Sequence, residues 1–154
     1  MKAVIQRVKS ASVSVEGKTV GAIEKGFLIF LGVAQGDVEA DIHTLAEKIL
    51  KLRIFSDENG KMNRSVQDVG GEILVVSQFT LLANCRHGNR PDFLESALPE
   101  IADRFYETFK AIIKERLGKV ECGIFGADMQ VALVNDGPVT ILLDTETLKS
   151  KKMA

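Results

Sequence analysis

Four residues at the end of one apolar run have the types and spacing that could do chemistry. Ser77-Gln78-Phe79-Thr80 directly follows Ile73-Leu74-Val75-Val76, a run that predicts a buried strand. The pattern puts hydroxyl and amide groups where a strand leaves the core, a common place for a site. Ser and Thr hydroxyls also cap strand ends and turns by bonding to nearby backbone. On the pattern alone, a catalytic site and a structural cap both remain open.

A second segment, Asn135-Asp136-Gly137-Pro138-Val139-Thr140, lies between two apolar runs. Taken alone it predicts a turn, because Asn, Asp and Gly tolerate positive φ and proline has no N–H for a ladder. A cis Gly137–Pro138 bond is compatible with this sequence, although only about 5–6% of X–Pro bonds are cis.

Conventional catalytic groups are scarce. The two histidines lie apart, with His43 on the expected solvent face of a helix and His87 in a basic loop. No His, Cys, Asp or Glu cluster has metal-ligand spacing, so we expect no zinc site. There is no G-x-S-x-G elbow and no glycine-rich phosphate loop. Any catalysis should therefore depend on backbone dipoles and positioning rather than on a charged relay.

Strands dominate the elements that must position these segments. Period-two and continuous apolar runs predict strands over residues 2–9, 11–16, 19–24, 26–33, 72–79, 120–125, 129–134 and 139–143. The hairpin-like spacing near the amino terminus favours mixed or antiparallel pairing over a doubly wound parallel sheet. We predict a mixed α/β fold with a curved sheet or barrel and helices packed on one face.

Two sizeable helices are expected between the strands. The first is capped by Asp37 and buries a stripe made of Ile42, Leu45, Ile49 and Leu52. Pro91 suits the first position of a helix. The longer helix is expected over about 99–117, ending at Gly118, with Ile101, Phe105, Ile112 and Ile113 facing inward. Residues 1–154 should form a single compact domain, with residues 149–154 as a frayed tail.

Composition limits the classes of function. Lys and Arg total 20 against 21 Asp and Glu, giving a formal net charge of −1, which argues against wrapping long nucleic acid such as DNA. Cys85 and Cys122 are expected to be ordinary reduced thiols. The longest apolar run, residues 26–34, is about half of a membrane span, and the first residues are not a signal peptide. We therefore expect a cytoplasmic protein that does not enter a membrane.

Five stretches together resemble the D-aminoacyl-tRNA deacylases. They are MKAVIQRV, AEKILKLRIF, SQFTL, RHGNRPDF and NDGPVT, in that order along the chain, so the resemblance covers essentially all of it. His87 and Asp92 depart from the usual form of the basic loop. Ser77 and Phe79 match the branch specific for D-amino acids, since the branch specialised for L-alanine typically has Pro-Gln-Ala there.

The resemblance implies a β/β/α fold, a homodimer, no cofactor or metal, and hydrolysis of the ester between a D-amino acid and tRNA. It assigns Ser77, Gln78, Phe79 and Thr80 to the catalytic segment. Gly137-Pro138 of one subunit, in the cis form, would face that segment of the partner and would be braced by Arg7. The substrate-binding set is Arg7, Asn135, Gly137, Pro138, Val139 and Thr140. Arg86, His87, Arg90, Lys61 and Arg64 are candidates for phosphate contacts with the tRNA acceptor end, although a merely solvated basic loop remains an alternative.

The chemistry of these groups fits that role. Backbone carbonyls of Gly137-Pro138 are acceptors for an ammonium group, and the rigid pair would clash with the Cβ of an L-residue. Glycine has no Cβ, so glycyl-tRNA should also be hydrolysed. Water would attack the ester while N–H groups around Phe79 and Thr80 steady the oxyanion. No base flanks Thr80, so we expect it to position rather than to attack, with the ribose 2′-hydroxyl assisting the water.

Two other functions remain open from the sequence. One is hydrolysis of another small acyl or amide substrate by the same residues without tRNA. The other is a non-catalytic dimeric binding module in which Gly137-Pro138 is only a turn.

Overall fold

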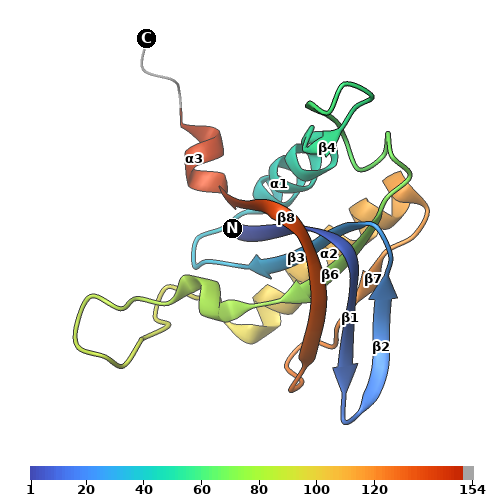
Figure 1. Cartoon of the computed structure of the whole chain (residues 1–154). Helices are drawn as coiled ribbons and strands as arrows, with labels where there is room; N and C mark the ends of the chain where they lie inside the picture. Colours follow the sequence, from blue (N-terminus) through green and yellow to red (C-terminus); the bar gives the residue numbers. More distant parts are fainter. Residues whose placement is uncertain (151–154) are drawn as a thin grey trace.

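A computed structural model describes residues 1–150 of the chain as one mixed α/β domain (Figure 1). The strands are β1 (Lys2–Val15), β2 (Lys18–Ile23), β3 (Gly26–Gly32), β4 (Phe55–Ser56), β5 (Met62–Arg64), β6 (Glu72–Ser77), β7 (Glu121–Cys122) and β8 (Gln130–Asp144). The helices are α1 (Glu39–Lys51), α2 (Pro99–Leu117), α3 (Thr145–Lys149) and the short 3₁₀ helix η1 (Phe79–Leu82).

One mixed sheet carries the order β2-β1-β3-β6-β7, with β8 pairing along β1. The pairs β1–β2, β1–β3 and β1–β8 are antiparallel, whereas β3–β6 and β6–β7 are parallel. The two outer strands approach each other closely, since a Cβ on Gly21 of β2 would lie 2.8 Å from the Cys122 carbonyl oxygen of β7. The sheet is therefore nearly closed, which confirms the predicted curved mixed sheet or barrel.

Side chains alternate between two cores on the faces of this sheet. Phe27, Ile29 and Leu31 of β3 belong to the larger core, which α1 and α2 cover. Leu28 points the other way, into a smaller core with Val13 of β1 and residues of β2 and β6. This alternation is the period of a strand that is covered on both faces. The predicted β/β/α layering and the helices on one face are thus confirmed.

Several predicted strands differ from the observed ones. The two at 2–9 and 11–16 are one long β1, which bends where its pairing passes from β3 to β2. The strand predicted over 72–79 ends at Ser77, because η1 begins at Phe79. The one predicted over 120–125 is only Glu121–Cys122, a short parallel edge.

Helix α2 spans Pro99–Leu117 as predicted, with Pro99 in its first turn and Gly118 in the left-handed region at φ 80°. Its inward face was partly mispredicted, since Ile101 is 38% exposed and Ala102 lies inside in its place. Pro91 is also not a helix start, because it lies in the loop well before α2.

The start of α1 differs from the prediction as well. The helix begins at Glu39, and the Asp37 carboxylate accepts a hydrogen bond from the Ala34 N–H at 2.7 Å instead of capping. Asp41 takes the capping role, because its carboxylate accepts from the Val38 N–H at 2.8 Å. The expected frayed tail lies mostly outside the described residues, and its first member, Lys149, ends α3.

Within residues 1–150, no helix has both the length and the apolarity needed to cross a membrane.

Candidate functional site

The chain turns sharply at the end of β6. The Gln78 N–H donates to the Leu31 carbonyl at 2.8 Å, which fixes the turn to the neighbouring strand β3. The Gln78 side-chain amide donates to the Thr80 hydroxyl oxygen. Phe79 and Thr80 form the first turn of η1, where a helix leaves its N–H groups without intrahelical acceptors. Two backbone donors are therefore available beside exposed side chains.

A cleft of about 650 Å³ opens directly beside this turn. Ser77, Gln78 and Phe79 line one side of it, and Thr80 lies just outside. The other walls come from the loop before α2, the start of α2 and the loop after β7, with Phe93, Leu98, Phe125 and Met129 among them. The lining is mostly apolar, as in many small-molecule sites. Its polar side chains are Ser77 and Gln78 at the end of β6, with Ser96 and Asp128 on the other walls.

Sequence patterns did not indicate the remote walls. Phe93 ends the RHGNRPDF stretch, whereas Leu98, Phe125 and Met129 lie outside the five stretches that carry the resemblance, and only the fold brings them to β6. Beneath the cleft, the Tyr106 hydroxyl donates to the Val75 carbonyl at 2.9 Å, and burial raises the pKa of Tyr106. This phenol is therefore a neutral structural donor under β6.

Gly137-Pro138 lies within a strand rather than in the predicted turn between two strands. Strand β8 runs unbroken from Gln130 to Asp144, so the predicted strands at 129–134 and 139–143 are one element. On β1, Gln6 pairs with Thr140 and Val8 with Asn135, which leaves residues 136–139 opposite the single residue Arg7. The segment is thus a bulge, and the Gly137–Pro138 bond in it is cis.

Arg7 holds the bulge by two backbone contacts. Its Nε donates to the Asp136 carbonyl at 3.0 Å and its Nη1 donates to the Ile54 carbonyl at 2.6 Å. Its Nε also lies 3.6 Å from the Asp136 carboxylate, and the side chain is 12% exposed. Gly137 and Pro138 remain exposed on the outer side of the bulge. The guanidinium fork therefore fixes the backbone behind an exposed Gly-Pro surface.

The two motif segments are not brought together within one chain. Ser77 of β6 pairs with Leu31 at one end of β3. Arg7 of β1 pairs with Phe27 near the other end of β3. Four residues of strand correspond to about 13 Å. The residues that line the cleft include none of 135–140.

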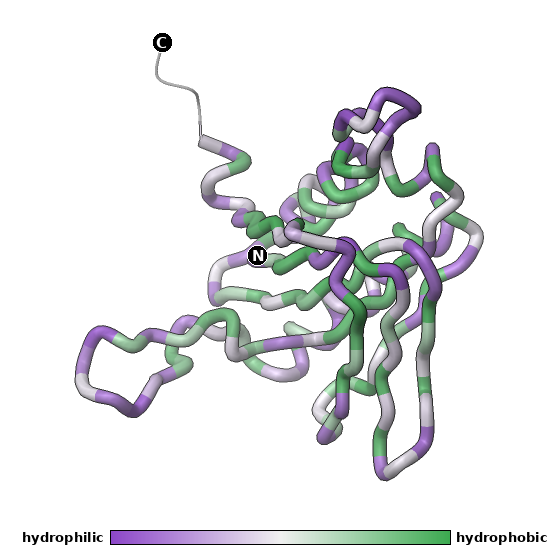
Figure 2. Tube along the Cα trace, in the orientation of Figure 1, coloured by the Kyte–Doolittle hydropathy of each residue, from purple (hydrophilic) through white to green (hydrophobic). Residues whose placement is uncertain are grey.

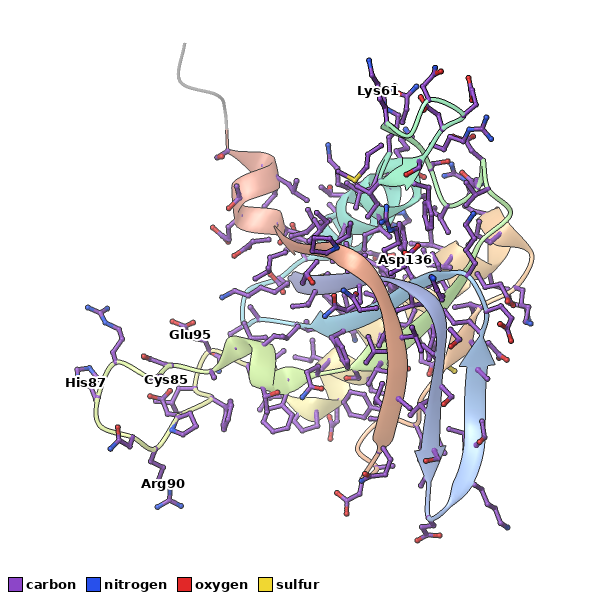
Figure 3. The ribbon with its side chains drawn as sticks, in the orientation of Figure 1. Lys61, Cys85, His87, Arg90, Glu95 and Asp136 are labelled. Carbon is purple, nitrogen blue, oxygen red and sulfur yellow. The ribbon has the colours of Figure 1, made fainter. Side chains whose placement is uncertain are left out.

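The candidate phosphate contacts fall into two groups (Figure 3). Arg86, His87 and Arg90 lie on the loop that projects from the body between η1 and α2, and all three are exposed. Much of this loop is hydrophilic (Figure 2). Lys61 and Arg64 lie far from it on the β4–β5 hairpin, where Arg64 forms an ion pair with Glu58 at 2.7 Å. The five residues therefore do not form one patch.

Other predictions about reactive side chains can be compared directly. His43 is exposed on α1, as predicted. Cys85 and Cys122 are both free thiols, also as predicted. Among residues 1–150, no group of three or more His, Cys, Asp or Glu side chains is arranged to hold a metal ion.

Comparison with known proteins covers nearly the whole chain. The family model described as D-Tyr-tRNA(Tyr) deacylase matches residues 4–144. A D-aminoacyl-tRNA deacylase of Thermosipho africanus is 62% identical over 146 residues, covering 95% of this chain and 98% of that protein. One of Dictyoglomus turgidum is 59% identical over 152 residues, covering 99% and 97%.

A solved structure described as c-Myc DNA Unwinding Element Binding Protein is 45% identical, with a TM-score of 0.87 over 94% of this chain and 98% of that one. The matched residues 4–144 include both the Ser77–Thr80 turn and the Gly137-Pro138 bulge. The chain therefore belongs to the D-Tyr-tRNA(Tyr) deacylase family.

Proposed function

We propose that this protein acts in the cytoplasm, where it hydrolyses the ester bond between a D-amino acid and the terminal adenosine of tRNA. The family and the close relatives show that the chain is a D-aminoacyl-tRNA deacylase and so an ester hydrolase. One observation carries it: the 62% identity to such an enzyme across 95% of the chain. The arrangement of the site supports a cleft shared between two subunits, selection of the D-amino acid and attack by water.

The active unit is a homodimer in which the Gly137-Pro138 bulge of one subunit closes the cleft of the other. The separation of the two motif segments within one chain supports this, because a site that uses both needs two copies. Strand β8 also supports it, since its Leu133, Val134 and Leu142 are 37%, 53% and 75% exposed. Exposed apolar side chains gathered on one strand are typical of an interface.

Chirality is selected by exclusion at the bulge. The bare Gly137 and the rigid Pro138 present carbonyl acceptors to the ammonium of the substrate and leave no room for an L-side chain. Side chains of D-residues point away from this wall, so their identity is hardly tested. Asn135, Val139 and Thr140 shape the segment, and the Thr140 hydroxyl donates to the Gln6 side-chain oxygen at 2.6 Å. Glycyl-tRNA, which has no Cβ, is expected to be a substrate.

Hydrolysis proceeds by attack of water on the ester carbonyl. The N–H groups of Phe79 and Thr80 stabilise the oxyanion that develops, while Ser77 and Gln78 contact the substrate. The Thr80 hydroxyl already accepts from Gln78, which suits a positioning role. The ribose 2′-hydroxyl next to the ester assists the water. A covalent aminoacyl adduct on Thr80, detected by mass spectrometry, would show instead that Thr80 attacks.

The first prediction concerns the substrate. Incubation with D-Tyr-tRNA, L-Tyr-tRNA and Gly-tRNA should release the D-ester and the glycyl ester rapidly and leave the L-ester intact, because only L-tyrosine carries a Cβ into the wall. Release is measured by acid precipitation of labelled aminoacyl-tRNA, with and without a chelator. Equal loss of the D- and L-esters contradicts the exclusion of L-residues by Gly137-Pro138. Loss of activity in the chelator contradicts a cofactor-free reaction.

The second prediction concerns the shared site. A Gly137→Val chain blocks the partner's cleft, and a Phe79→Asp chain places a carboxylate beside the oxyanion, so each homodimer should be inactive. After the two are unfolded and refolded together, about half of the dimers are mixed and each has one intact site. Recovery of about a quarter of wild-type activity is expected. If the mixture stays inactive, the site is not shared between subunits.

Arg86, His87, Arg90, Lys61 and Arg64 are proposed to contact phosphates of the acceptor end. A similar structure carries a name that refers to DNA, which describes that protein. For this chain we propose tRNA, because a net charge of −1 suits a small local contact better than a long duplex.

The third prediction distinguishes tRNA from duplex DNA as the ligand of the basic loop. Replacing Arg86 and Arg90 by alanine should raise KM for D-Tyr-tRNA and make its salt dependence shallower by about 1.5 in log–log slope. The double variant Lys114→Ala/Arg116→Ala is the control, because it removes the same charge at the far end of α2 and should change neither. Duplex DNA at equal phosphate concentration should not inhibit deacylation. Full inhibition by duplex DNA would favour DNA as a ligand.

A further inference from the structure

A single aromatic contact joins the projecting loop to the cleft. The ring centroids of Phe79 and Phe93 lie 5.0 Å apart at an interplanar angle of 70°, an edge-to-face arrangement. Phe79 follows the end of β6, whereas Phe93 comes from the far side of the loop before α2, and both line the cleft. Phe79 is 55% exposed, so Phe93 covers part of a ring that otherwise faces solvent.

Backbone hydrogen bonds hold Phe93 in place on both sides. Just before it, Asn84 and Asp92 exchange N–H to carbonyl bonds of 2.8 and 3.0 Å, which pinch the loop closed. Just after it, the Ala97 N–H donates to the Val33 carbonyl at 2.9 Å, beyond the end of β3. Phe93 is therefore fixed close to the sheet and does not depend on the exposed tip of the loop.

The ring that Phe93 contacts belongs to the residue that carries an oxyanion donor. Phe79 lies directly after the turn at Gln78 and begins η1, which is only four residues long. The rotamers open to the Phe79 side chain depend on its backbone φ and ψ, so the position of the ring and the local backbone conformation are linked. A neighbour that fixes the ring therefore also limits the directions in which the Phe79 N–H can point.

We propose that Phe93 is a positioning residue of the deacylation site and acts through Phe79. This inference rests on the proposed function and adds to it a residue that lies outside both motif segments. Oxyanion donors are effective because they are oriented before the reaction and need no reorganisation during it. Without the Phe93 ring, the Phe79 N–H samples other directions, and the loss falls on the transition state rather than on binding of the tRNA.

The test compares four variants at this position and its neighbour with D-Tyr-tRNA as substrate. Phe93→Ala and Phe93→Leu should lower kcat about tenfold, which corresponds to about 1.4 kcal/mol of barrier, and should change KM less than twofold. Leucine is included because it retains bulk without the ring. Phe93→Trp should restore kcat to within twofold of wild type. Leu94→Ala is the control, because that side chain is 78% exposed and lies outside the cleft.

A double-variant cycle tests whether Phe93 acts through Phe79. If it does, Phe79→Leu/Phe93→Leu should be no slower than the slower single variant, since both remove the same contact. Multiplication of the two single effects, or a Phe93→Leu enzyme with wild-type kcat, overturns the proposal. A fall in kcat for Leu94→Ala as large as that for Phe93→Leu overturns it too.

A spectroscopic readout does not depend on turnover. The chain contains no tryptophan, so Phe93→Trp introduces a single tryptophan, whose emission can be excited apart from that of Tyr106. Its emission should shift to the red when Phe79→Ala is added, and it should change when 3′-D-tyrosylamido-adenosine, which cannot be hydrolysed, fills the cleft. Emission that responds to neither change overturns the positioning role. If wild-type enzyme fails to hydrolyse D-Tyr-tRNA while the emission responds, the proposed function has failed and the contact stands.

Discussion

Gly26→Ala should leave no stably folded protein. A Cβ at this position would lie 1.8 Å from the Glu72 carbonyl oxygen and 2.7 Å from the Glu72 nitrogen. Both atoms are backbone, so no side chain can turn aside to make room. Gly26 pairs with Glu72 on one side and with Val8 on the other, at the start of the central strand β3. Relief of the clash must therefore separate β3 from β6.

The expected cost is about 4 kcal/mol or more, a large part of the stability of an ordinary domain. Urea unfolding followed by far-UV circular dichroism measures it, together with the soluble yield. Gly17→Ala is the control: a Cβ there meets no atom within 4 Å, and only its φ of 79° costs energy, about 1–2 kcal/mol. If Gly26→Ala is no less stable than Gly17→Ala, the close β3–β6 contact is wrong.

The elements that the sequence predicted well have local signals at both ends. Helix α2 begins at Pro99, whose φ is already fixed near the helical value, and stops at Gly118, which adopts the left-handed region without a steric cost. Strand β3 was recognised because it is apolar on both faces, which only a doubly covered strand tolerates. The position of Ser77 at the end of β6 was predicted for the same reason, since a polar segment directly after such a run must lie at a strand end.

The elements that were mispredicted depend on partners distant in sequence. Residues 135–138 have the local preferences of a turn, yet β1 pairs with β8 on both sides of them and keeps the strand continuous. Asp37 has the residue type and position of a helix cap, but its carboxylate accepts a hydrogen bond from the Ala34 N–H instead. Phe93 and Phe125 reach the cleft through loops whose sequences say nothing of where they pack. Local preference cannot predict such contacts.

The same non-local contacts explain why Arg7 matters more than its place in an ordinary strand pattern suggests. Arg7→Ala should lower the discrimination between D-Tyr-tRNA and L-Tyr-tRNA about a hundredfold, because a shift of about 1 Å in a site can change rates by that factor. Without its guanidinium, the Asp136 and Ile54 carbonyls lose their charged donor, and residues 136–138 are free to move away from the L-side chain. The rates for both esters are measured under single-turnover conditions.

Arg7→Lys tests whether the positive charge or the hydrogen-bond geometry of Arg7 maintains the discrimination between D- and L-esters. Lysine keeps the positive charge, but a single ammonium lacks the planar fork that reaches the Asp136 and Ile54 carbonyls together, so discrimination should fall nearly as far as in Arg7→Ala. Arg116→Ala is the control, since it removes an arginine from an exposed ion pair with Glu47, and such pairs contribute about 0–1 kcal/mol. If Arg7→Lys discriminates as well as wild type, the charge beside Asp136 is sufficient. The bulge would then hold its shape without the two hydrogen bonds, and the chiral wall would be a property of Gly137-Pro138 alone.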